Sequence, residues 1–536
     1  MKNLRKISAM ILVVMLMTTV LAGCSGNTEK KANSDSETSK QEEANTQEAN
    51  TEDVKEEPIE IKIYRPGFSK YGAQKVIDEI GKATNTIPVF LENGWDEADQ
   101  KTALMITTGD DVDWVNVEAT QPYKTWGENG LILDLGPILE EHKAELPVLY
   151  AIAFSDTFKA FRGSNGEVYA IPSLGMVQNN GLKMRSDWLA EVGIEPPTTL
   201  DGVYQALKAF KEKGLGGSSG YPLAAGTDNG VLGSFGFVFY AHGVEPKIRY
   251  TKVGDNYVDQ TLTEGTKEAV RWIRNAYQDG LISEDFPTAA ASDFFKTGMA
   301  GAIYDSNAYN EDLYQVNSEY SSVVLDAPKG PTGIQSYGGE SPMWLLNTIT
   351  KQTKDPLRVL KLIEYMHSKE GRLLSCFGIE GIHYEVTADG LIDVNAGQAG
   401  RLEDFNNGED CPIYWGYVSG MPIYFEMDKY DTFEEALSNS LFLKTVPKEP
   451  IDKDYWGMVE KINKFAKPYK YSAYNVESIK SLHVEMDEIR SVFFMNAILT
   501  KNFDFDAEWD GFIETYKAAG GTECERLFGE YMADFE

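Results

Sequence analysis

Residues 96–118 read DEADQKTALMITTGDDVDWVNVE, and this stretch decides the fold class. The residues from Asp96 to Thr108 predict a helix that Gly109 ends. A polar turn then leads into Asp113–Val117, an apolar run that predicts a short buried strand. A helix that leads directly into a buried strand is a unit of an α/β layered domain.

The segments before this stretch repeat the same alternation. Ile59–Tyr64 alternates apolar and polar residues and predicts an opening strand, which Arg65-Pro66-Gly67 ends. Apolar residues at positions 76, 77 and 80 have helical spacing, and Pro88–Leu91 predicts a second strand. Strands that alternate with helices of this length predict an α/β domain with a largely parallel sheet.

The remainder of the chain continues in this manner without an obvious boundary. One helical element is predicted over 188–214, with Thr198 and Asp201 as a capping pair, and others over 356–371 and 476–499. The roughly 480 residues after residue 57 are enough for two or three domains. They contain no internal repeat and no proline- or glycine-rich linker. Two lobes, if present, are therefore expected to be interleaved in sequence.

The first two dozen residues carry an export signal. Basic residues at positions 2, 5 and 6 precede an apolar run from Ile7 to Leu21. A stable membrane span needs about twenty apolar residues, so this run is too short. Leu21-Ala22-Gly23-Cys24 resembles the lipobox of bacterial lipoproteins, which implies a signal peptide over 1–23 and a lipid on Cys24. The alternative is an ordinary secretory peptide in which Cys24 has no role.

Residues 24–57 have the composition of a disordered acidic tether. From Ser25 to Glu57 the chain carries ten acidic and four basic side chains, and Val54 is the only large aliphatic residue. Such a segment buries too little apolar surface to offset the entropy lost on folding. We expect the protein to lie on the outer face of the cytoplasmic membrane, held there only by its lipid.

Charge and composition restrict the possible partners. The formal net charge of -33 disfavours nucleic acid and anionic membrane surfaces. The five histidines show no zinc-ligand spacing, and residues 389–395 do not fit a calcium-binding EF-hand, as a calcium-binding adhesion lipoprotein would need. No phosphate-binding G-x-x-x-x-G-K-[ST] loop occurs, so we expect no cofactor. If Cys24 is lipidated, the other three cysteines, Cys376, Cys411 and Cys524, allow at most one disulfide.

Several motifs together carry a family resemblance. In chain order they are Thr107–Asp113, Asn129–Leu135, Gly166–Pro172, Arg185–Leu189, Gly193-Ile194 with Pro197–Thr199, and Gly378–Tyr384. They resemble motifs of the extracellular solute-binding lipoproteins that serve carbohydrate importers of the ATP-binding-cassette type, especially the large oligosaccharide-binding group of Gram-positive bacteria. Val112 departs from the proline usual in that family's Gly-Asp turn. Beyond Tyr384 the similarity is one of pattern and length.

The resemblance implies a two-lobed α/β fold of the periplasmic-binding-protein type II, with interleaved lobes and a hinge. Closure of the lobes would bury a ligand in the cleft between them. By the family's chain path, Ala170-Ile171-Pro172 leads into the first crossing and Ala327–Pro331 carries the return. Lobe one would then hold 58–177 and 327–385, and lobe two 178–326 and 386–536.

The implied function is binding without catalysis. We expect one oligosaccharide ligand per molecule, captured in the cleft and passed to the membrane permease subunits of an ATP-binding-cassette importer. We also expect a monomer. A sugar that carries uronate would need an arginine at the cleft, and Arg65 and Arg185 are available.

Candidate ligand-binding residues follow from the rule that ligands of open α/β sheets bind beyond the carboxyl ends of the strands. Sugars present apolar faces and hydroxyl groups, so aromatic and polar side chains are favoured. The candidates in the first lobe and its crossings are Arg65, Phe68, Ser69, Trp95, Asp113, Trp114, Glu118, Glu340 and Trp344. Those in the second lobe are Arg185, Tyr304, Asp305, Asn307, Tyr414 and Trp415.

Two other functions stay open at this point. An exported glycoside hydrolase would also combine aromatic residues with carboxylates, but it needs two of them held about 5 to 10 Å apart, which a sequence with 83 acidic residues cannot identify. Gly216–Gly220 matches the G-x-S-x-G hydrolase pattern, yet it follows a predicted helix instead of a strand, so a loop is predicted. A peptide-binding transport receptor of the same fold is the other alternative.

Overall fold

The structure is a computed structural model, which describes residues 57–65, 74–91, 98–119, 121–174, 180–226, 232–246, 248–306, 310–339, 343–388, 392–393, 396–397, 461–462, 464–466 and 476–534. The chain divides into two compact units, Met1–Lys55 and Glu56–Glu536, and every described residue belongs to the second. The predicted signal peptide, Cys24 and the tether except for Glu57 lie outside the described residues.

Strands and helices alternate along the described chain. The strands are β1 (Ile59–Tyr64), β2 (Thr86–Leu91), β3 (Trp114–Glu118), β4 (Ile171–Leu174), β5 (Gly181–Arg185), β6 (Tyr221–Ala224), β7 (Tyr250–Val253), β8 (Asn256–Asp259), β9 (Ala300–Asp305), β10 (Ser322–Val324), β11 (Met343–Ile349), β12 (Glu385–Val386) and β13 (Ile392–Asp393). The helices are α2 (Gln74–Thr84), α3 (Ala98–Thr108), α4 (Tyr123–Glu128), α5 (Gly136–Glu141), α6 (Pro147–Phe154), α7 (Ser186–Val192), α8 (Leu200–Lys213), α9 (Gly236–Ala241), α10 (Glu264–Gln278), α11 (Ala291–Lys296), α12 (Asn310–Val316), α13 (Pro356–His367), α14 (Lys369–Phe377), α20 (Glu477–Leu499), α21 (Phe505–Tyr516) and α22 (Thr522–Ala533).

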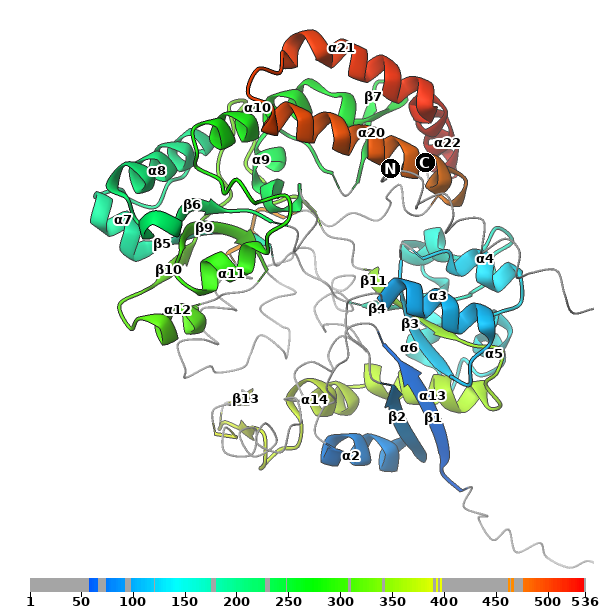
Figure 1. Ribbon diagram of the computed structural model, residues 1–536. Coiled ribbons are helices and arrows are strands. Elements are labelled where there is room, and N and C mark those ends of the chain that lie inside the picture. Colours follow the sequence, from blue (N-terminus) through cyan, green and yellow to red (C-terminus); the bar gives the residue numbers. More distant parts are fainter. Residues whose placement is uncertain are drawn as a thin grey trace, which may run out of the picture. The chain divides into compact units, whose positions relative to one another are not determined.

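Five strands form the first sheet, in the order β2-β1-β3-β11-β4 (Figure 1). β1 pairs in parallel with β2 and β3, whereas β11 runs antiparallel to both of its neighbours, β3 and β4. Every strand but β11 therefore points the same way, which confirms the predicted, largely parallel sheet. β11 comes from residues 343–349, so this sheet joins two separate parts of the sequence, as interleaved lobes require.

The second sheet has four strands in the order β10-β5-β9-β6. β9 is antiparallel to β5 and parallel to β6, so this sheet is mixed. All six residues of β9 are buried, which makes it a central strand covered on both faces. We call the parts built around the first and second sheets the first and the second lobe.

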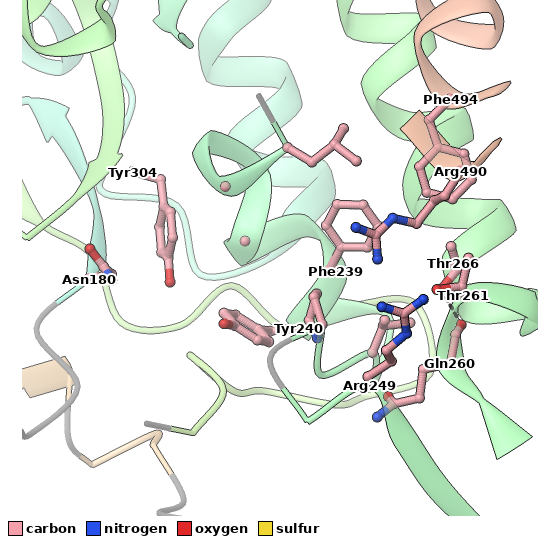
Figure 2. A pocket seen from close by; sticks show the side chains of 15 residues that line it. Asn180, Phe239, Tyr240, Arg249, Gln260, Thr261, Thr266, Tyr304, Arg490 and Phe494 are labelled. Atoms are coloured by element: carbon pink, nitrogen blue, oxygen red, sulfur yellow. Dashed lines mark hydrogen bonds between the residues drawn. The ribbon is translucent and has the colours of Figure 1, made fainter. Parts of the chain in front are cut away.

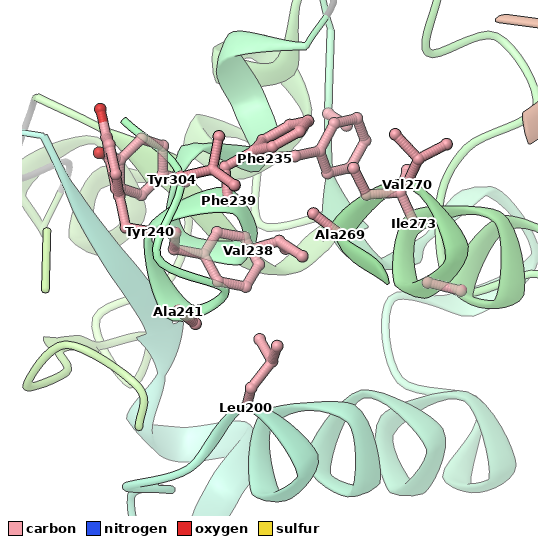
Figure 3. Close-up of a cluster of buried hydrophobic side chains, with 14 of the residues drawn as sticks. Leu200, Phe235, Val238, Phe239, Tyr240, Ala241, Ala269, Val270, Ile273 and Tyr304 are labelled. Carbon is pink, nitrogen blue, oxygen red and sulfur yellow. The ribbon is translucent and has the colours of Figure 1, made fainter. Parts of the chain in front are cut away.

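Each lobe has its own hydrophobic core. The first core gathers Ile61, Trp114 and Val115 of the sheet with apolar residues of α6 and α13. The second core is larger, and Figure 3 shows part of it, where α9 and α10 direct apolar side chains toward one another. Ala327 and Tyr337 belong to the second core. The family resemblance implies that the chain returns to the first lobe at Ala327–Pro331. In the structure, the chain still packs with the second lobe at Tyr337.

The C-terminal helices complete the second lobe. Phe493 of α20 stacks on Phe512 of α21 with the ring centroids 4.3 Å apart, and Trp509 packs at 5.9 Å from Phe493. Arg274 of α10 donates hydrogen bonds to backbone carbonyls at the end of α20, including that of Thr500 at 2.9 Å. Apolar burial and the hydrogen bonds from Arg274 thus hold residues 476–534 to the second lobe, which contains α10.

Most of the predicted elements are confirmed, with small shifts at their ends. The opening strand has the predicted bounds, and Gly109 ends α3 with a φ of 72°. α8 ends at Gly214 as predicted, but its N-cap is Thr199 and not Thr198. Gly216–Gly220 lies between α8 and β6, so it lacks the strand-to-helix turn of a hydrolase nucleophile. Within the described part of the chain, no helix combines the length and the apolar character that a membrane crossing requires.

Candidate ligand-binding site

A pocket of about 320 Å³ lies within the second lobe (Figure 2). Its volume is at the lower end of the range for small-molecule sites, about 300 to 1,000 Å³. Its walls combine aromatic, amide and charged side chains. The lining residues labelled in the figure are Asn180, Phe239, Tyr240, Arg249, Gln260, Thr261, Thr266, Tyr304, Arg490 and Phe494.

One end of the pocket lies at the edge of the second sheet. Tyr304 is the last residue but one of β9, and Asn180 directly precedes β5. Because these strands are antiparallel, with Gly181 opposite Asp305, the end of β9 and the start of β5 meet at the same edge. The carboxyl ends of strands are where open α/β sheets bind ligands. Tyr304 therefore lies where the strand-end argument placed it, and its role in binding stays a prediction.

Two close approaches to glycine shape the aromatic wall. A Cβ atom on Gly236 would lie 2.7 Å from Cε1 of Tyr304, so the absence of a side chain lets this ring reach α9. A Cβ atom on Gly338, which has a φ of +75°, would lie 2.2 Å from Cε1 of Tyr240. Both tyrosine rings are thus positioned by backbone that only glycine leaves open.

Gly338→Ala is expected to weaken ligand binding and to lower the free energy of unfolding by more than Gly333→Ala does. Both glycines have positive φ, but a Cβ atom on Gly333 meets nothing within 4 Å. The control thus measures backbone strain alone, about 1 kcal/mol, and any excess at Gly338 reports the displacement of Tyr240. Urea unfolding and titration calorimetry would measure both effects. Equal losses in the two variants would contradict this account of the wall.

The other end of the pocket contains a buried ion-pair network. Arg249 donates from Nε to Asp259 at 3.1 Å, from Nη1 to Asp487 at 2.8 Å and from Nη2 to the hydroxyl of Tyr516 at 2.7 Å. The Tyr516 hydroxyl in turn donates to Asp259 at 2.6 Å. Each of the three guanidinium nitrogens of Arg249 therefore donates to a group of the protein, which holds this side chain in place.

Arg490 is differently placed. Its Nη2 lies 3.2 Å from Oδ1 of Asp487, but its Nε is buried and has no hydrogen-bond partner among the described residues. Figure 2 shows its guanidinium between the Phe239 ring and Arg249. A buried donor without a partner is unfavourable by about 1 to 3 kcal/mol, which an acceptor on a ligand would relieve. Arg490 is therefore the charged side chain of this pocket most suited to ligand contact.

A buried lysine supports the turn at the end of β9. Lys183 of β5 is fully buried and donates from Nζ to the backbone carbonyl of Asp305 at 2.5 Å. Burial lowers the pKa of Lys183 to about 7, and the nearby charge of Asp305 only partly opposes this effect. Asp305 itself accepts hydrogen bonds from the backbone and hydroxyl of Ser306. The carboxylate of Asp305, a predicted ligand contact, thus stabilises the turn that follows β9.

The stability of the wild-type protein relative to Lys183→Met is expected to rise with pH above about 7. Because the pKa is lower in the folded state, the unfolded chain binds more protons between about pH 7 and 10, so deprotonation favours folding. The difference in unfolding free energy should change by about 1 kcal/mol per pH unit in this window. Urea titrations of both proteins at pH 6, 7, 8 and 9 would measure it. A difference that does not vary with pH would refute the assignment.

Three of the predicted contacts have partners within the protein. Arg185 is fully buried, pairs with Asp187 and lies 3.9 Å from the centroid of the Tyr320 ring, so it fixes the fold of the second lobe. Trp114 is fully buried in the first core, and its Nε1 donates to Asn347 at 3.0 Å. Asp113 precedes β3 instead of following a strand, and it accepts from the backbone N–H of Lys62 at 2.9 Å. All three are used by the protein itself.

The other candidates divide into placed residues and residues outside the described part. Arg65 directly follows β1 but is only 3% exposed. Glu118 is the half-buried last residue of β3, at the expected end of the first sheet. Trp344 lies in β11, and nothing is described of its side chain. The candidates outside the described residues are Phe68, Ser69, Trp95, Asn307, Glu340, Tyr414 and Trp415.

Sequence reasoning missed most of the pocket. Phe239 and Tyr240 come from a short apolar helix that reads as core, and they carry no strand-end signal. Arg490 lies in a long helix whose pattern predicts only packing. Asn180 was within reach, because it stands next to a strand, although at its start. Only the antiparallel pairing of β5 and β9 brings that start to the ligand-binding edge.

These features define a class of protein, the solute-binding proteins with two α/β lobes, and the comparisons identify the family. The family model for bacterial extracellular solute-binding proteins matches residues 75–374, and this chain belongs to that family. The fold agrees with that of a solved relative. The structure is an EF-hand mutant of FusA, an ATP-binding-cassette transporter substrate-binding protein of Streptococcus pneumoniae, in complex with fructo-nystose. It has a TM-score of 0.66 at 17% identity, and the match covers 89% of this chain and 99% of that one. The predicted fold class is confirmed.

Curated relatives match only in part. Lipoprotein LipO of Bacillus subtilis is 28% identical over 241 residues, which is 41% of this chain and 47% of that protein. The polygalacturonan/rhamnogalacturonan-binding protein YtcQ, also of Bacillus subtilis, is 24% identical over 42% of this chain and 47% of its own length. The chain thus spans about half the length of the curated relatives that it matches.

Proposed function

We propose that this protein is the substrate-binding component of an ATP-binding-cassette importer and that it captures an oligosaccharide in the pocket of the second lobe. The observation that carries the proposal is a pocket that combines Tyr304 and Asn180, at the edge of the second sheet, with Tyr240 of α9. Aromatic rings suit the apolar faces of sugars, and amide groups both donate to and accept from hydroxyl groups.

The names of the relatives support the same substrate class. FusA was crystallised with fructo-nystose, and YtcQ is named for binding polygalacturonan and rhamnogalacturonan. Polygalacturonan carries carboxylates, and Arg490 is the pocket residue suited to pair with one. We therefore propose oligosaccharides as the class and include acidic members of it. The protein itself carries out no catalysis and passes the intact sugar to membrane permease subunits.

The remaining parts of the proposal concern anchoring and assembly. Cys24 would carry the lipid, as the name of LipO supports, and residues 24–57 would tether a monomeric body outside the cytoplasmic membrane. The lobes would comprise 58–177 with 327–385 and 178–326 with 386–536, apart from the segment up to Tyr337 that packs with the second core. We also propose that a bound oligosaccharide reaches beyond this pocket, to Glu118 of the first lobe and to the candidates outside the described residues.

A thermal-shift screen of the purified protein tests the substrate class. The panel contains neutral xylo-, fructo- and manno-oligosaccharides, oligogalacturonates, and peptides of similar mass. A ligand at a hundred times its Kd stabilises the folded state by about 2.7 kcal/mol, which is easily measured. Stabilisation by a sugar that mass spectrometry recovers intact supports the proposal. A shortened sugar would indicate a glycoside hydrolase, and a response to peptides alone would move the assignment to peptide transport.

A further inference from the structure

A second pocket, of about 780 Å³, lies on the second lobe between α8 and α10. It shares no lining residue with the pocket of Figure 2. Tyr204 and Gln205 come from α8, Trp272 and Asn275 from α10, His242 directly follows α9, and Lys329 closes one side. Figure 3 shows the core side of the same three helices, from which Leu200, Ala241 and Ala269 point inward. We call this second pocket the interhelical groove.

The floor of the groove is aromatic and fixed in place. Tyr204 and Trp272 pack edge to face with their ring centroids 5.3 Å apart, and Trp272 meets Phe237 in the same way at 5.8 Å. The Tyr204 hydroxyl donates to Oδ2 of Asp279 at 3.0 Å. Both rings of the floor are only partly buried. Partly exposed rings held rigidly offer an apolar platform without further loss of side-chain entropy.

A buried polar atom lines the groove without a partner. Nε2 of His242 is buried and has no hydrogen-bond partner within the part of the chain that the structure describes. Burial lowers the pKa of His242, so its imidazole is neutral at physiological pH and Nε2 carries a proton in only one of the two tautomers. A hydroxyl group satisfies either tautomer, because it both donates and accepts.

Three of the charged side chains around the groove, Arg271, Glu268 and Asp279, are paired, whereas Asp201 and Lys329 form no ion pair among the described residues. Arg271 donates to both carboxylate oxygens of Asp506, at 2.9 and 2.6 Å, and to Glu268 at 3.1 Å. Lys208 lies 3.5 Å from the carboxylate of Asp279. What the two helices leave exposed on the groove are the amides of Gln205 and Asn275. The two remaining charges, on Asp201 and Lys329, are of opposite sign and give the groove no net preference for an ion. The rings of the floor and the exposed amides suit a neutral, hydroxyl-rich molecule.

We propose that the interhelical groove is an accessory carbohydrate site, which binds a neutral saccharide on Tyr204 and Trp272 with hydroxyl contacts to His242, Gln205 and Asn275. This site is separate from the transport site and does not depend on the ligand proposed there. It would allow the protein to hold a glycan chain outside the pocket that captures the transported sugar.

Fluorine nuclear magnetic resonance of the full chain labelled with 5-fluorotryptophan tests the proposal. The Trp272 signal is assigned with Trp272→Phe, and xylotetraose, cellotetraose and maltotetraose are the probes. We expect at least one of them to shift the Trp272 signal saturably. Gln205→Ala and Asn275→Ala should each weaken that Kd about fivefold, the loss typical of one hydrogen bond. Gln315→Ala, at an exposed glutamine of α12, should leave it unchanged.

The variants separate direct binding from a transmitted change. Lys329 belongs to the connection predicted to cross between the lobes, and it hydrogen-bonds to Thr198 at 2.9 Å. A shift transmitted from closure would keep its Kd in the Gln205 and Asn275 variants, and this result would overturn the proposal. A sugar that stabilises the protein in the thermal screen without moving the Trp272 signal would overturn it too, yet leave the transport function standing. A sugar that shifts the Trp272 signal, when no sugar of the thermal screen stabilises the protein, would support the accessory site and count against the transport function.

Discussion

Asp259→Ala is expected to lower the free energy of unfolding by about 3 to 5 kcal/mol, the loss typical when one partner of a buried ion pair is removed. Asp259 is fully buried at the end of β8 and accepts hydrogen bonds from Arg249, Tyr516 and the backbone of Thr261. Without it, Arg249 keeps a buried charge whose remaining acidic partner, Asp487, is partly exposed. The hairpin β7–β8 would then lose its hydrogen bond to Tyr516 of α21.

Asp255→Ala provides the matched control. Asp255 is an exposed aspartate in the turn of the same hairpin, and its removal should change stability by less than about 0.5 kcal/mol. Urea unfolding followed by circular dichroism would compare the two variants with the wild type. A loss below about 1 kcal/mol for Asp259→Ala would mean that the network does not hold the C-terminal helices to the lobe.

Arg490→Gln is expected to weaken ligand binding about thirtyfold, which corresponds to about 2 kcal/mol for a hydrogen bond from a charged donor. Among the described residues the buried Nε of Arg490 has no partner, and the bound sugar would supply one. The loss should be larger for an oligogalacturonate than for a neutral sugar of equal length, because a carboxylate also loses its counter-charge.

Arg526→Gln is the control for this experiment. Arg526 is an exposed arginine of α22 that pairs with Glu523 and Glu530, far from the lining of the pocket. Titration calorimetry with the sugar found in the thermal screen gives both affinities, and a parallel melting curve checks that each variant is folded. Unchanged affinity in Arg490→Gln would exclude this side chain from the site.

The fold was largely predictable because most of its helices and strands have local sequence patterns that indicate them. Ile59–Tyr64 alternates in the period of a strand, and Gly109 and Gly214 take the left-handed conformation that ends a helix. The return of the chain at β11 was not predictable from such signals. A short apolar strand gives no indication of its neighbours, and β11 pairs with strands far earlier in the chain. The resemblance supplied what periodicity did not.

The site was less predictable for a related reason. The strand-end rule selected Tyr304, which lines the pocket, but it also selected Trp114, which is fully buried. Arg185, which was offered as a partner for uronate, is fully buried too. The residue type alone does not show whether an arginine or a tryptophan contacts a ligand or packs in the core. Tyr240 and Arg490 meet only when α9 and α20 pack in the same lobe, and a pairing of that kind has no mark in either segment.

The place of β11 in the first sheet has a consequence for the timing of folding. As the chain is synthesised, β3 and β4 become available long before residues 343–349, the strand that must lie between them. The bond between Trp114 and Asn347 joins residues 233 positions apart, and contacts of such separation form slowly. Until β11 arrives, the first lobe cannot close. The first lobe therefore completes its sheet only after the strands β5 to β10 of the chain have already been synthesised.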